Sequence, residues 1–175
     1  MAKTTYSALV KLLGENGNFP NNSTLPVLFY KNVLKQTQTG DVKKLLSQNQ
    51  WEKAWVDKIY PFHHYHSNTH EVLGICEGRC DVELGGPNGY FLQLERGDVL
   101  ILPAGVSHRN IRSTENLTVV GAYPSNIVPT YNMQFGKTHE RPKVDSEIKK
   151  TSLPDTDPIF GNYGLIFHYW RNSGN

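Results

Sequence analysis

A chain of 175 residues has the length of one domain and is long enough to bury a core. Its formal charge of +2 at pH 7 comes from 18 basic and 16 acidic side chains that are scattered along the sequence, so we expect no nucleic-acid partner. No apolar run approaches the roughly 20 residues of a membrane-spanning helix, and the first residues lack the apolar stretch of a signal peptide. We therefore expect a soluble, cytoplasmic protein with no membrane partner.

The first 50 residues are expected to form a helical extension. Thr5 to Leu13 carries leucines at helical spacing and is followed by a glycine, a common helix stop. Residues 25–30 form a short apolar run, which we expect to be an edge strand because Pro26 has no N–H group to donate to a neighbouring strand. A second helix is expected from Asp41 to Leu46, with the aspartate as its cap and three apolar residues on one face.

From residue 51 onward the sequence changes to short β-type runs, about 8 to 12 residues apart, with turn residues between them. The clearest turn is Gly85 to Gly89, because its Asn-Gly pair tolerates positive φ. This pattern predicts an all-β sandwich or barrel with its core at residues 51–123 and a last strand at residues 164–170. The expected strands of the core are residues 55–60, 62–66, 71–76, 80–84, 90–94, 99–102, 108–112 and 117–123.

Two other features are left open by the sequence. Residues 124–158 are polar and contain several prolines, and so long a structureless segment is often functional. It is either a lid or wall of a site, or a surface excursion or dimer arm. Cys76 and Cys80 flank a tight turn, where free thiols are expected in a reducing cytosol and a cross-strand disulfide is the alternative. Two cysteines alone are too few for a structural zinc site.

Four of the chain's seven histidines lie within eight residues, and a carboxylate follows them directly. Alternate residues of a strand share a face, so His64 and His66 point the same way and His63 points the other way. Glu71 has the wrong parity for one unbroken strand, but a turn after His66 would return it to the same side. A turn that differed by one residue would present His70 instead.

His108 is expected to lie on a separate strand, which follows a corner formed by Pro103, Ala104 and Gly105. A lone histidine in a strand is more often a surface or core residue than a ligand, and a lone glutamate is more often solvated. The combination of these histidines and the glutamate at this spacing is more specific for a metal site than any one of them. Three imidazoles and one carboxylate suit a divalent first-row metal and leave coordination positions open for water or substrate.

The two segments resemble the two sequence motifs of the cupin family. The first motif, His-x-His followed after four residues by Glu and after six more by Gly, is matched by His64, His66, Glu71 and Gly78. The second motif, Gly followed after five residues by Pro-x-Gly and after two more by His, is matched by Gly97, Pro103, Gly105 and His108. Lys58 and Arg112 depart from the family pattern at the motif ends, where a glycine and an asparagine are usual, and neither position is a ligand.

This resemblance implies a cupin-type double-stranded β-helix, or jelly-roll barrel, as one domain over residues 1–175. It implies a divalent transition metal (Fe, Mn, Ni or Zn) held by His64, His66, Glu71 and His108. Side chains near the ligands should orient the imidazoles, and the candidates are Tyr65, Tyr90, Tyr123 and Arg109. By analogy with other small cupins we expect a homodimer.

The chain's flanks resemble uncharacterised bacterial single-domain cupins, and this likeness implies no reaction. Because the cupin resemblance implies a metal site with open coordination positions, our first hypothesis is a metal-dependent enzyme on a small molecule, dioxygenase-like or isomerase-like. A binding or sensing module without turnover is the alternative, because one fold serves both roles. A purely structural barrel is disfavoured, since all four ligand positions are filled.

Overall fold

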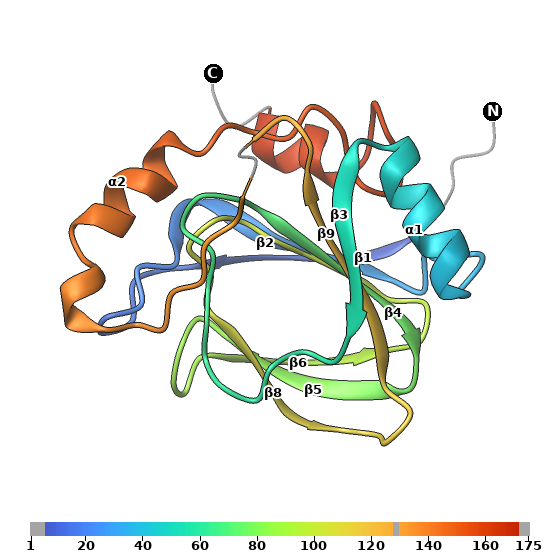
Figure 1. Cartoon of the computed structure of the whole chain (residues 1–175), viewed down its shortest axis with the longest axis horizontal. Helices are drawn as coiled ribbons and strands as arrows, with labels where there is room; N and C mark the ends of the chain where they lie inside the picture. Colours follow the sequence, from blue (N-terminus) through green and yellow to red (C-terminus); the bar gives the residue numbers. More distant parts are fainter. Residues whose placement is uncertain (1–5, 128–129, 172–175) are drawn as a thin grey trace.

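The computed structural model describes residues 6–127 and 130–171. Two antiparallel sheets face each other, and helices lie outside the larger one (Figure 1). Within the described residues the larger sheet has the strand order β1-β2-β7-β4-β9-β3 and the smaller has the order β6-β5-β8. The strands are β1 (Ser7–Leu13), β2 (Asn22–Lys31), β3 (Trp51–Asp57), β4 (Glu71–Glu77), β5 (Arg79–Leu84), β6 (Tyr90–Glu95), β7 (Val99–Leu102), β8 (His108–Ser113) and β9 (Thr118–Pro124). The helices are α1 (Thr39–Gln48), a 3₁₀ turn (Thr138–Glu140), α2 (Lys143–Lys150) and the π-helical η2 (Ile166–Arg171).

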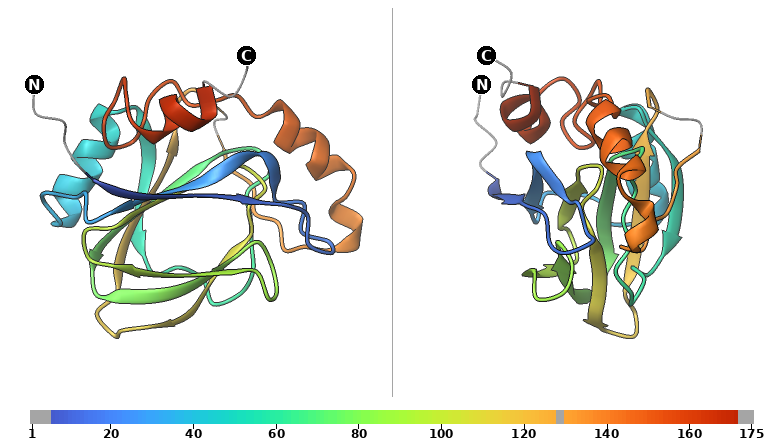
Figure 2. Two further views of the ribbon diagram at one scale, coloured as in Figure 1. Left: turned by 180° about the vertical axis from the view of Figure 1, so that it is seen from behind. Right: turned by 90° about the vertical axis from the view of Figure 1, so that its left-hand side faces the viewer.

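The larger sheet is buried on both faces. Leu73 of β4 points into the core between the two sheets, whereas its neighbour Val72 points into a second core beneath α1 and η2. Helices α1 and η2 cover the side of the larger sheet that faces away from the smaller one (Figure 2). Because both faces are covered, β4 and β7 are nearly continuous apolar runs rather than alternating ones. The predicted all-β fold is confirmed, and the two cores hold β4, which begins at Glu71, in place.

The predicted N-terminal helix is wrong. Residues 7–13 form strand β1, which pairs with β2 from Ser7 opposite Lys31. Leu9 and Leu13 pack against the core between the sheets, while Val10 packs on the other side. Leu9 and Leu13 therefore share one face, as the period of two of a strand requires, whereas Leu12 is exposed, and burial on the sheet outweighs the helical spacing. Thr5 lies outside the described residues.

The apolar run at residues 25–30 does form a strand, but β2 is not an edge. It lies between β1 and β7. Pro26 is tolerated because the pairing with β7 begins only at Leu28, and the pairing with β1 is irregular on the N-terminal side of Val27.

The helix expected at Asp41–Leu46 is present as α1. It begins earlier, at Thr39, so Asp41 lies in the first turn and does not cap the helix. Val42 and Leu46 are buried against the outer core, as the periodicity predicts. The helical extension therefore consists of two strands and this one helix.

The strand expected at residues 164–170 is wrong. The segment forms η2, in which Ile166 and Trp170 are buried, and Leu165 directly before it is buried as well. Their spacing is helical, and the carboxylate of Asp157 accepts a hydrogen bond from the backbone N–H of Ile166 at 3.3 Å. A helical turn therefore satisfies the backbone without a sheet edge.

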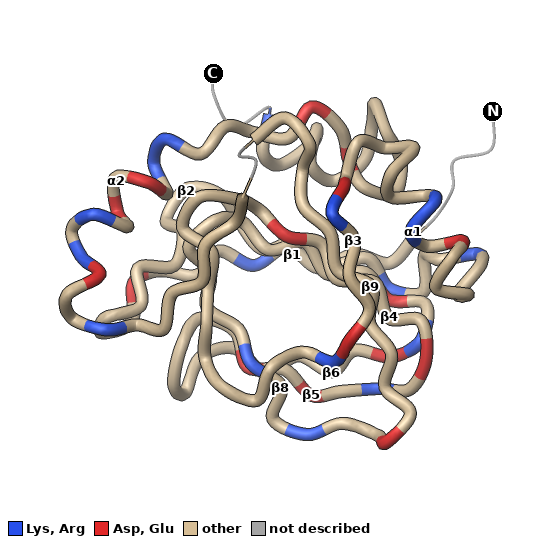
Figure 3. Tube along the Cα trace, in the orientation of Figure 1, with Lys and Arg blue, Asp and Glu red and all other residues tan. Residues whose placement is uncertain are grey.

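Two open questions of the sequence are answered. Cys76 and Cys80 are free thiols in different cores, and burial raises their pKa values to about 11 and about 12 respectively. The polar segment 124–158 is not structureless, since it contains α2. Lysine, arginine, aspartate and glutamate residues are interspersed over the described trace (Figure 3). In that part of the chain, no helix has the length and apolarity to cross a membrane.

Candidate metal site

The site is built where an extended segment meets the first residue of a strand. Residues 62–66, expected to be a strand, pair with their neighbours only through isolated bridges. In one bridge the backbone N–H of His64 donates to the carbonyl of His108 at 3.2 Å, and that of His108 donates back at 3.0 Å. The bridge holds the two imidazole rings with their centroids 4.2 Å apart.

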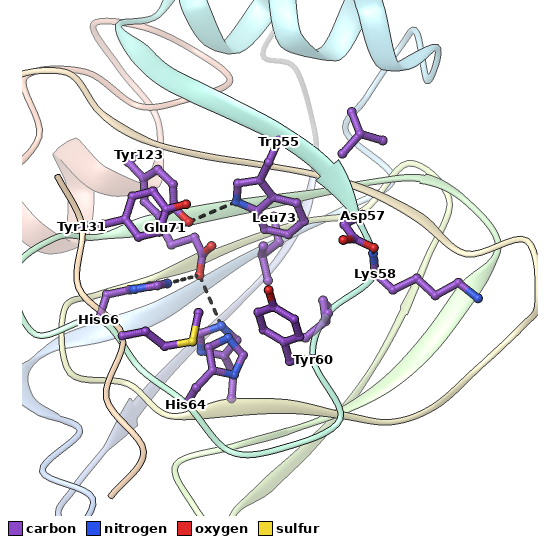
Figure 4. Close-up of a pocket in the computed structure, with 14 residues that line it drawn as sticks. Trp55, Asp57, Lys58, Tyr60, His64, His66, Glu71, Leu73, Tyr123 and Tyr131 are labelled. Carbon is purple, nitrogen blue, oxygen red and sulfur yellow. Dashed lines mark hydrogen bonds and ion pairs between the residues drawn. The ribbon is translucent and has the colours of Figure 1, made fainter. Parts of the chain in front are cut away.

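The expected turn after His66 brings Glu71, the first residue of β4, to the same side. The carbonyl of His66 accepts a hydrogen bond from the Gly105 backbone at 2.8 Å, which anchors the start of the turn. Oε2 of Glu71 then lies 3.4 Å from Nε2 of His66 and 3.2 Å from Nε2 of His108 (Figure 4). The structure thus brings all four predicted residues to one cavity, and all four are buried.

Each of the three imidazoles is oriented by a backbone carbonyl. Nδ1 of His64 donates to the carbonyl of Phe62 at 3.0 Å, and Nδ1 of His108 donates to that of Val106 at 3.2 Å. Nδ1 of His66 donates to the carbonyl of Asn132. A carbonyl only accepts, so in the neutral rings Nδ1 carries the proton and Nε2 keeps its lone pair. None of the four side chains proposed to orient the imidazoles makes these contacts.

Charge at the site favours a cation near Glu71. Burial opposes ionisation of this carboxyl, but the attraction of His66 and contacts with His108 outweigh burial and hold its pKa below the usual range. Burial alone would lower the pKa of His66, but the attraction of the Glu71 carboxylate is stronger, so the net effect is a raised pKa. Burial and the nearby His108 lower the pKa of His64 to about 3, which leaves its lone pair available at neutral pH.

The donor types at the site, three imidazoles and one carboxylate, are those that bind divalent transition metals. Oε2 of Glu71 is buried and makes no hydrogen bond of acceptable geometry, although two imidazole nitrogens are nearby. Two donors that each lie about 2.1 Å from one ion are about 3 to 3.4 Å apart, close to the distances found here. In their present positions, however, no three His, Cys, Asp or Glu side chains of the described residues form a metal-holding group. Binding an ion would therefore require side-chain adjustment.

The cavity beside these residues has a volume of about 190 Å³ and a mixed wall of polar, aliphatic and aromatic side chains. Tyr123 stacks on Tyr131 with ring centroids 4.2 Å apart, and its hydroxyl accepts a hydrogen bond from Nε1 of Trp55 at 3.1 Å (Figure 4). Of the side chains proposed to surround the ligands, only Tyr123 lines the cavity. The remaining lining residues are Val56, Asp57, Lys58, Ile59, Tyr60, Leu73 and Met133.

Sequence reasoning missed the residues that follow Tyr123. The strap, defined as residues 130–135, forms one wall of the cavity through Tyr131 and Met133. The side chain of Asn132 accepts from the Ser67 backbone at 2.9 Å and donates to the carboxylate of Glu147 at 3.2 Å. The wall interpretation of the polar segment is thereby confirmed for the strap. Its polarity and length were the only signals, and neither identified individual residues.

His63 and His70 face away from the cavity. His63 contacts the hydroxyl of Ser107 at 3.0 Å and the carboxylate of Glu83 at 3.1 Å. Nδ1 of His70 accepts from the Ala104 backbone at 2.9 Å, and its Nε2 donates to a carbonyl. The alternative in which His70 replaces a carboxylate at the cavity is therefore wrong.

Comparison with known proteins identifies the family. The model of the cupin family matches residues 29–145. This chain is a cupin. The uncharacterized protein YjlB of Bacillus subtilis (strain 168) is 36% identical over 156 residues, which cover 89% of this chain and 92% of that one.

Two further similarities concern acireductone dioxygenases. A probable inactive acireductone dioxygenase 2 of Caenorhabditis briggsae is 28% identical over 120 residues, which cover 58% of this chain and 74% of that protein. The structure of acireductone dioxygenase from Bacillus anthracis with a cadmium ion in its active centre is 19% identical, with a TM-score of 0.34, and covers 53% of this chain and 59% of that one. That structural similarity is too low to transfer a function.

The cupin motif glycines have a steric reason here. Gly105 has φ of +94°, and a Cβ added there would lie 2.4 Å from the carbonyl oxygen of Asn21. Gly78 has φ of +72°, and its Cβ would lie 2.9 Å from the backbone of Leu117. Both positions therefore require glycine, and the first keeps the corner that leads into His108.

Proposed function

We propose that this cupin binds one divalent transition metal ion (Fe, Mn, Ni or Zn) and acts on a small molecule in the adjoining cavity. The proposed ligands are His64, His66, Glu71 and His108. The observation that carries the proposal is the buried Oε2 of Glu71, which faces imidazole Nε2 atoms and makes no hydrogen bond to any described residue. A buried carboxylate oxygen without a hydrogen bond is costly unless a cation satisfies it.

The protein's own contribution is to hold and shield the site. Backbone carbonyls fix the three imidazoles, and the aromatic side chains of the cavity wall limit the access of water to the ligands. A bound divalent ion would supply Lewis acidity and, if it is iron, access to redox chemistry. Glu71 then serves as a ligand, so it is not available as a general base.

A binding or sensing role without turnover is the second candidate, because the cavity offers few groups for proton transfer. Besides the four proposed ligands, only Asp57 and Lys58 among the described lining residues carry a charge. Lys58 points away from the site and donates to the carbonyl of Glu115 at 2.9 Å (Figure 4). Burial and the nearby Glu71 raise the pKa of Tyr123, which keeps its hydroxyl protonated.

Elemental analysis of anaerobically purified protein tests the proposal, with wild type measured beside His66→Ala. We expect about one metal ion per chain in the wild type and little in the variant, because no other imidazole replaces the one removed. Stoichiometric iron would lead to oxygen-uptake screens, and nickel, zinc or manganese to isomerase and binding assays. Absence of metal from both proteins, even after reconstitution, would refute the site.

The proposed homodimer has a separate test. It rests on analogy with other small cupins. Sedimentation equilibrium at micromolar concentration should give a mass twice that of one chain. A monomer mass over the whole concentration range would contradict it.

A further inference from the structure

Tyr123 and Glu71 are neighbours on two paired strands. β4 and β9 are antiparallel, with Val72 opposite Ala122. The next residues along the two strands, Glu71 and Tyr123, therefore extend to the same face of the sheet. Both line the cavity, and Tyr123 is only 5% exposed. Figure 4 shows the tyrosine hydroxyl beside the carboxylate, on the side away from the imidazoles.

The oxygen of Tyr123 is fixed by a tryptophan. Nε1 of Trp55 donates a hydrogen bond to it at 3.1 Å. Trp55 lies on β3, on the other side of β9, where it pairs with Gly121. A Cβ at this glycine would lie 2.1 Å from the indole ring. Only glycine therefore lets the indole lie across the strand and reach the tyrosine.

The ring of Tyr123 is held as well as its oxygen. It stacks on Tyr131 with ring centroids 4.2 Å apart. The ring of His66 meets it edge to face, with centroids 5.5 Å apart and planes at 86°. Rotation of the tyrosine ring would break both contacts. The freedom that remains is rotation of the hydroxyl proton about the C–O bond.

The chemistry of the neighbours sets the direction of this proton. An indole N–H only donates, so Tyr123 accepts from Trp55 and keeps its own O–H for another acceptor. Burial and the negative charge of Glu71 raise the pKa of Tyr123, so the proton is present at neutral pH. The hydroxyl contacts the Glu71 carboxylate, which only accepts when it is ionised. Because Oε2 has no hydrogen bond among the described residues, Oε1 is left as the acceptor.

We infer that Tyr123 is a positioning residue for Glu71. Its O–H donates to Oε1, which directs Oε2 toward the imidazoles of His66 and His108, and Trp55 holds the hydroxyl in place. The inference rests on the proposed function, in which Oε2 is a metal ligand. Its new content is that a pair of side chains orients the carboxylate, whereas backbone carbonyls orient the imidazoles.

Zinc affinity, measured by competition with a chelator, tests the role of the hydroxyl. Tyr123→Phe keeps the ring contacts and should weaken zinc binding about tenfold, because the carboxylate loses its support. Tyr65→Phe is the matched control, since it removes a buried hydroxyl that donates to another carboxylate, that of Glu140 at 2.7 Å, and neither residue lines the cavity. Equal affinities of Tyr123→Phe and wild type, or an equal loss in both variants, would overturn the inference.

A double-mutant cycle tests the part played by the tryptophan. Trp55→Phe keeps an aromatic ring but removes the N–H, and should weaken zinc binding about threefold. Combined with Tyr123→Phe, it should add less than about twofold, because the N–H acts through the hydroxyl that is already gone. Losses that multiply would mean that the two side chains act separately, which would contradict the inference.

The visible absorption of cobalt-saturated protein separates positioning from stability. At saturation the spectrum reports the arrangement of the ligands and not the affinity. Tyr123→Phe should change the cobalt band intensities, because the carboxylate turns, and Tyr65→Phe should leave them as in the wild type. An unchanged spectrum in Tyr123→Phe would show that the hydroxyl only stabilises the fold.

Metal content measured in the same samples distinguishes this inference from the proposed function. If the wild type binds neither zinc nor cobalt, the proposed metal site fails and the positioning role fails with it. If the wild type binds one ion per chain and Tyr123→Phe matches it in affinity and spectrum, the metal site stands and the positioning role is rejected.

Discussion

Two clusters of histidine and carboxylate lie back to back in this cupin. The open cluster consists of His64, His66, Glu71 and His108, and the closed cluster consists of His63, Glu83, Ser107 and Arg109. Consecutive residues contribute to opposite clusters, since 63 and 64, and likewise 107 and 108, point to different sides. The carboxylates of both clusters, Glu71 and Glu83, are buried, so burial alone does not separate the clusters.

The two clusters differ in whether their polar atoms have partners. In the closed cluster, Oε2 of Glu83 accepts from Nε of Arg109 at 2.6 Å and from Nε2 of His63 at 3.1 Å, and Oε1 accepts from the Asn88 backbone at 2.7 Å. In the open cluster, Oε2 of Glu71 has no hydrogen bond and lies beside a cavity. An unsatisfied buried atom facing a cavity points to a ligand, whereas a satisfied network points to structure.

The closed cluster has the connectivity of a nucleophilic triad. Ser107, His63 and Glu83 follow one another through hydrogen bonds, as a serine, a base and its orienting acid would. Ser107 is fully buried, however, and does not line the cavity. A substrate could not reach its hydroxyl, so the chain of contacts is a structural network.

The largest contrast is expected from single histidine replacements. His64→Ala and His108→Ala should each weaken metal affinity by more than about 100-fold, because loss of a ligand exceeds the 10- to 100-fold cost of losing a residue that supports one. His63→Ala should leave affinity within about threefold. Competition with a fluorescent chelator measures all three. A comparable loss in His63→Ala would mean that the clusters are not separate.

The two carboxylates give the next contrast. Glu71→Gln should lower metal affinity strongly, because an amide oxygen lacks the negative charge. Glu83→Gln should leave metal affinity unchanged but lower the free energy of unfolding by about 1 to 3 kcal/mol, because charged contacts with Arg109 and His63 are weakened. Urea denaturation and metal titration of both variants test this. A loss of metal affinity in Glu83→Gln with none in Glu71→Gln would show that the closed cluster, and not the open one, binds the metal.

The open cluster could be predicted from sequence because its signal is local. His64 and His66 share a face by strand parity, and a polar turn returns Glu71 to them. The same reasoning placed His63 on the other face, as the structure has it. Its partner Glu83 lies 20 residues away on β5. Nothing in the sequence pairs these two residues, so the closed cluster could not be predicted.

The fold errors have a common physical cause. Residues 7–13 and 164–170 are short apolar segments at the chain's two ends, where periodicity is read over few residues. Leu9 and Leu13 in the first segment fit either period, and pairing with β2 stabilises a strand there. The second segment was assigned as a strand by composition, and its contacts with Asp157 favour a helical turn. Central strands such as β7 were predicted correctly because turn residues bound them on both sides.

A smaller effect is expected in the strap, which supports the open cluster from outside. Asn132→Ala should weaken metal affinity about tenfold. The substitution removes the side-chain amide that fixes the strap, so the backbone carbonyl of residue 132, which accepts from His66, is held less firmly. Asn126→Ala is the matched control, since among the described residues that exposed amide donates to the Leu153 carbonyl, away from the cavity. Equal metal affinity in both variants would show that the strap does not support the site.

The smallest effect is expected for a neutral hydroxyl in the closed cluster. Ser107→Ala removes one hydrogen bond to His63 and should lower the free energy of unfolding by about 1 kcal/mol, with metal affinity unchanged. Ser113→Ala, at the exposed end of β8, the strand that follows Ser107, should change the free energy of unfolding by less than about 0.5 kcal/mol. Chemical denaturation with a parallel metal titration measures both quantities. Ser107 belongs to the closed cluster, and its neighbour His108 belongs to the open one. A fall in metal affinity in Ser107→Ala at constant stability would mean that loss of the hydroxyl disturbs His108 through the backbone. The two clusters would then act as one site.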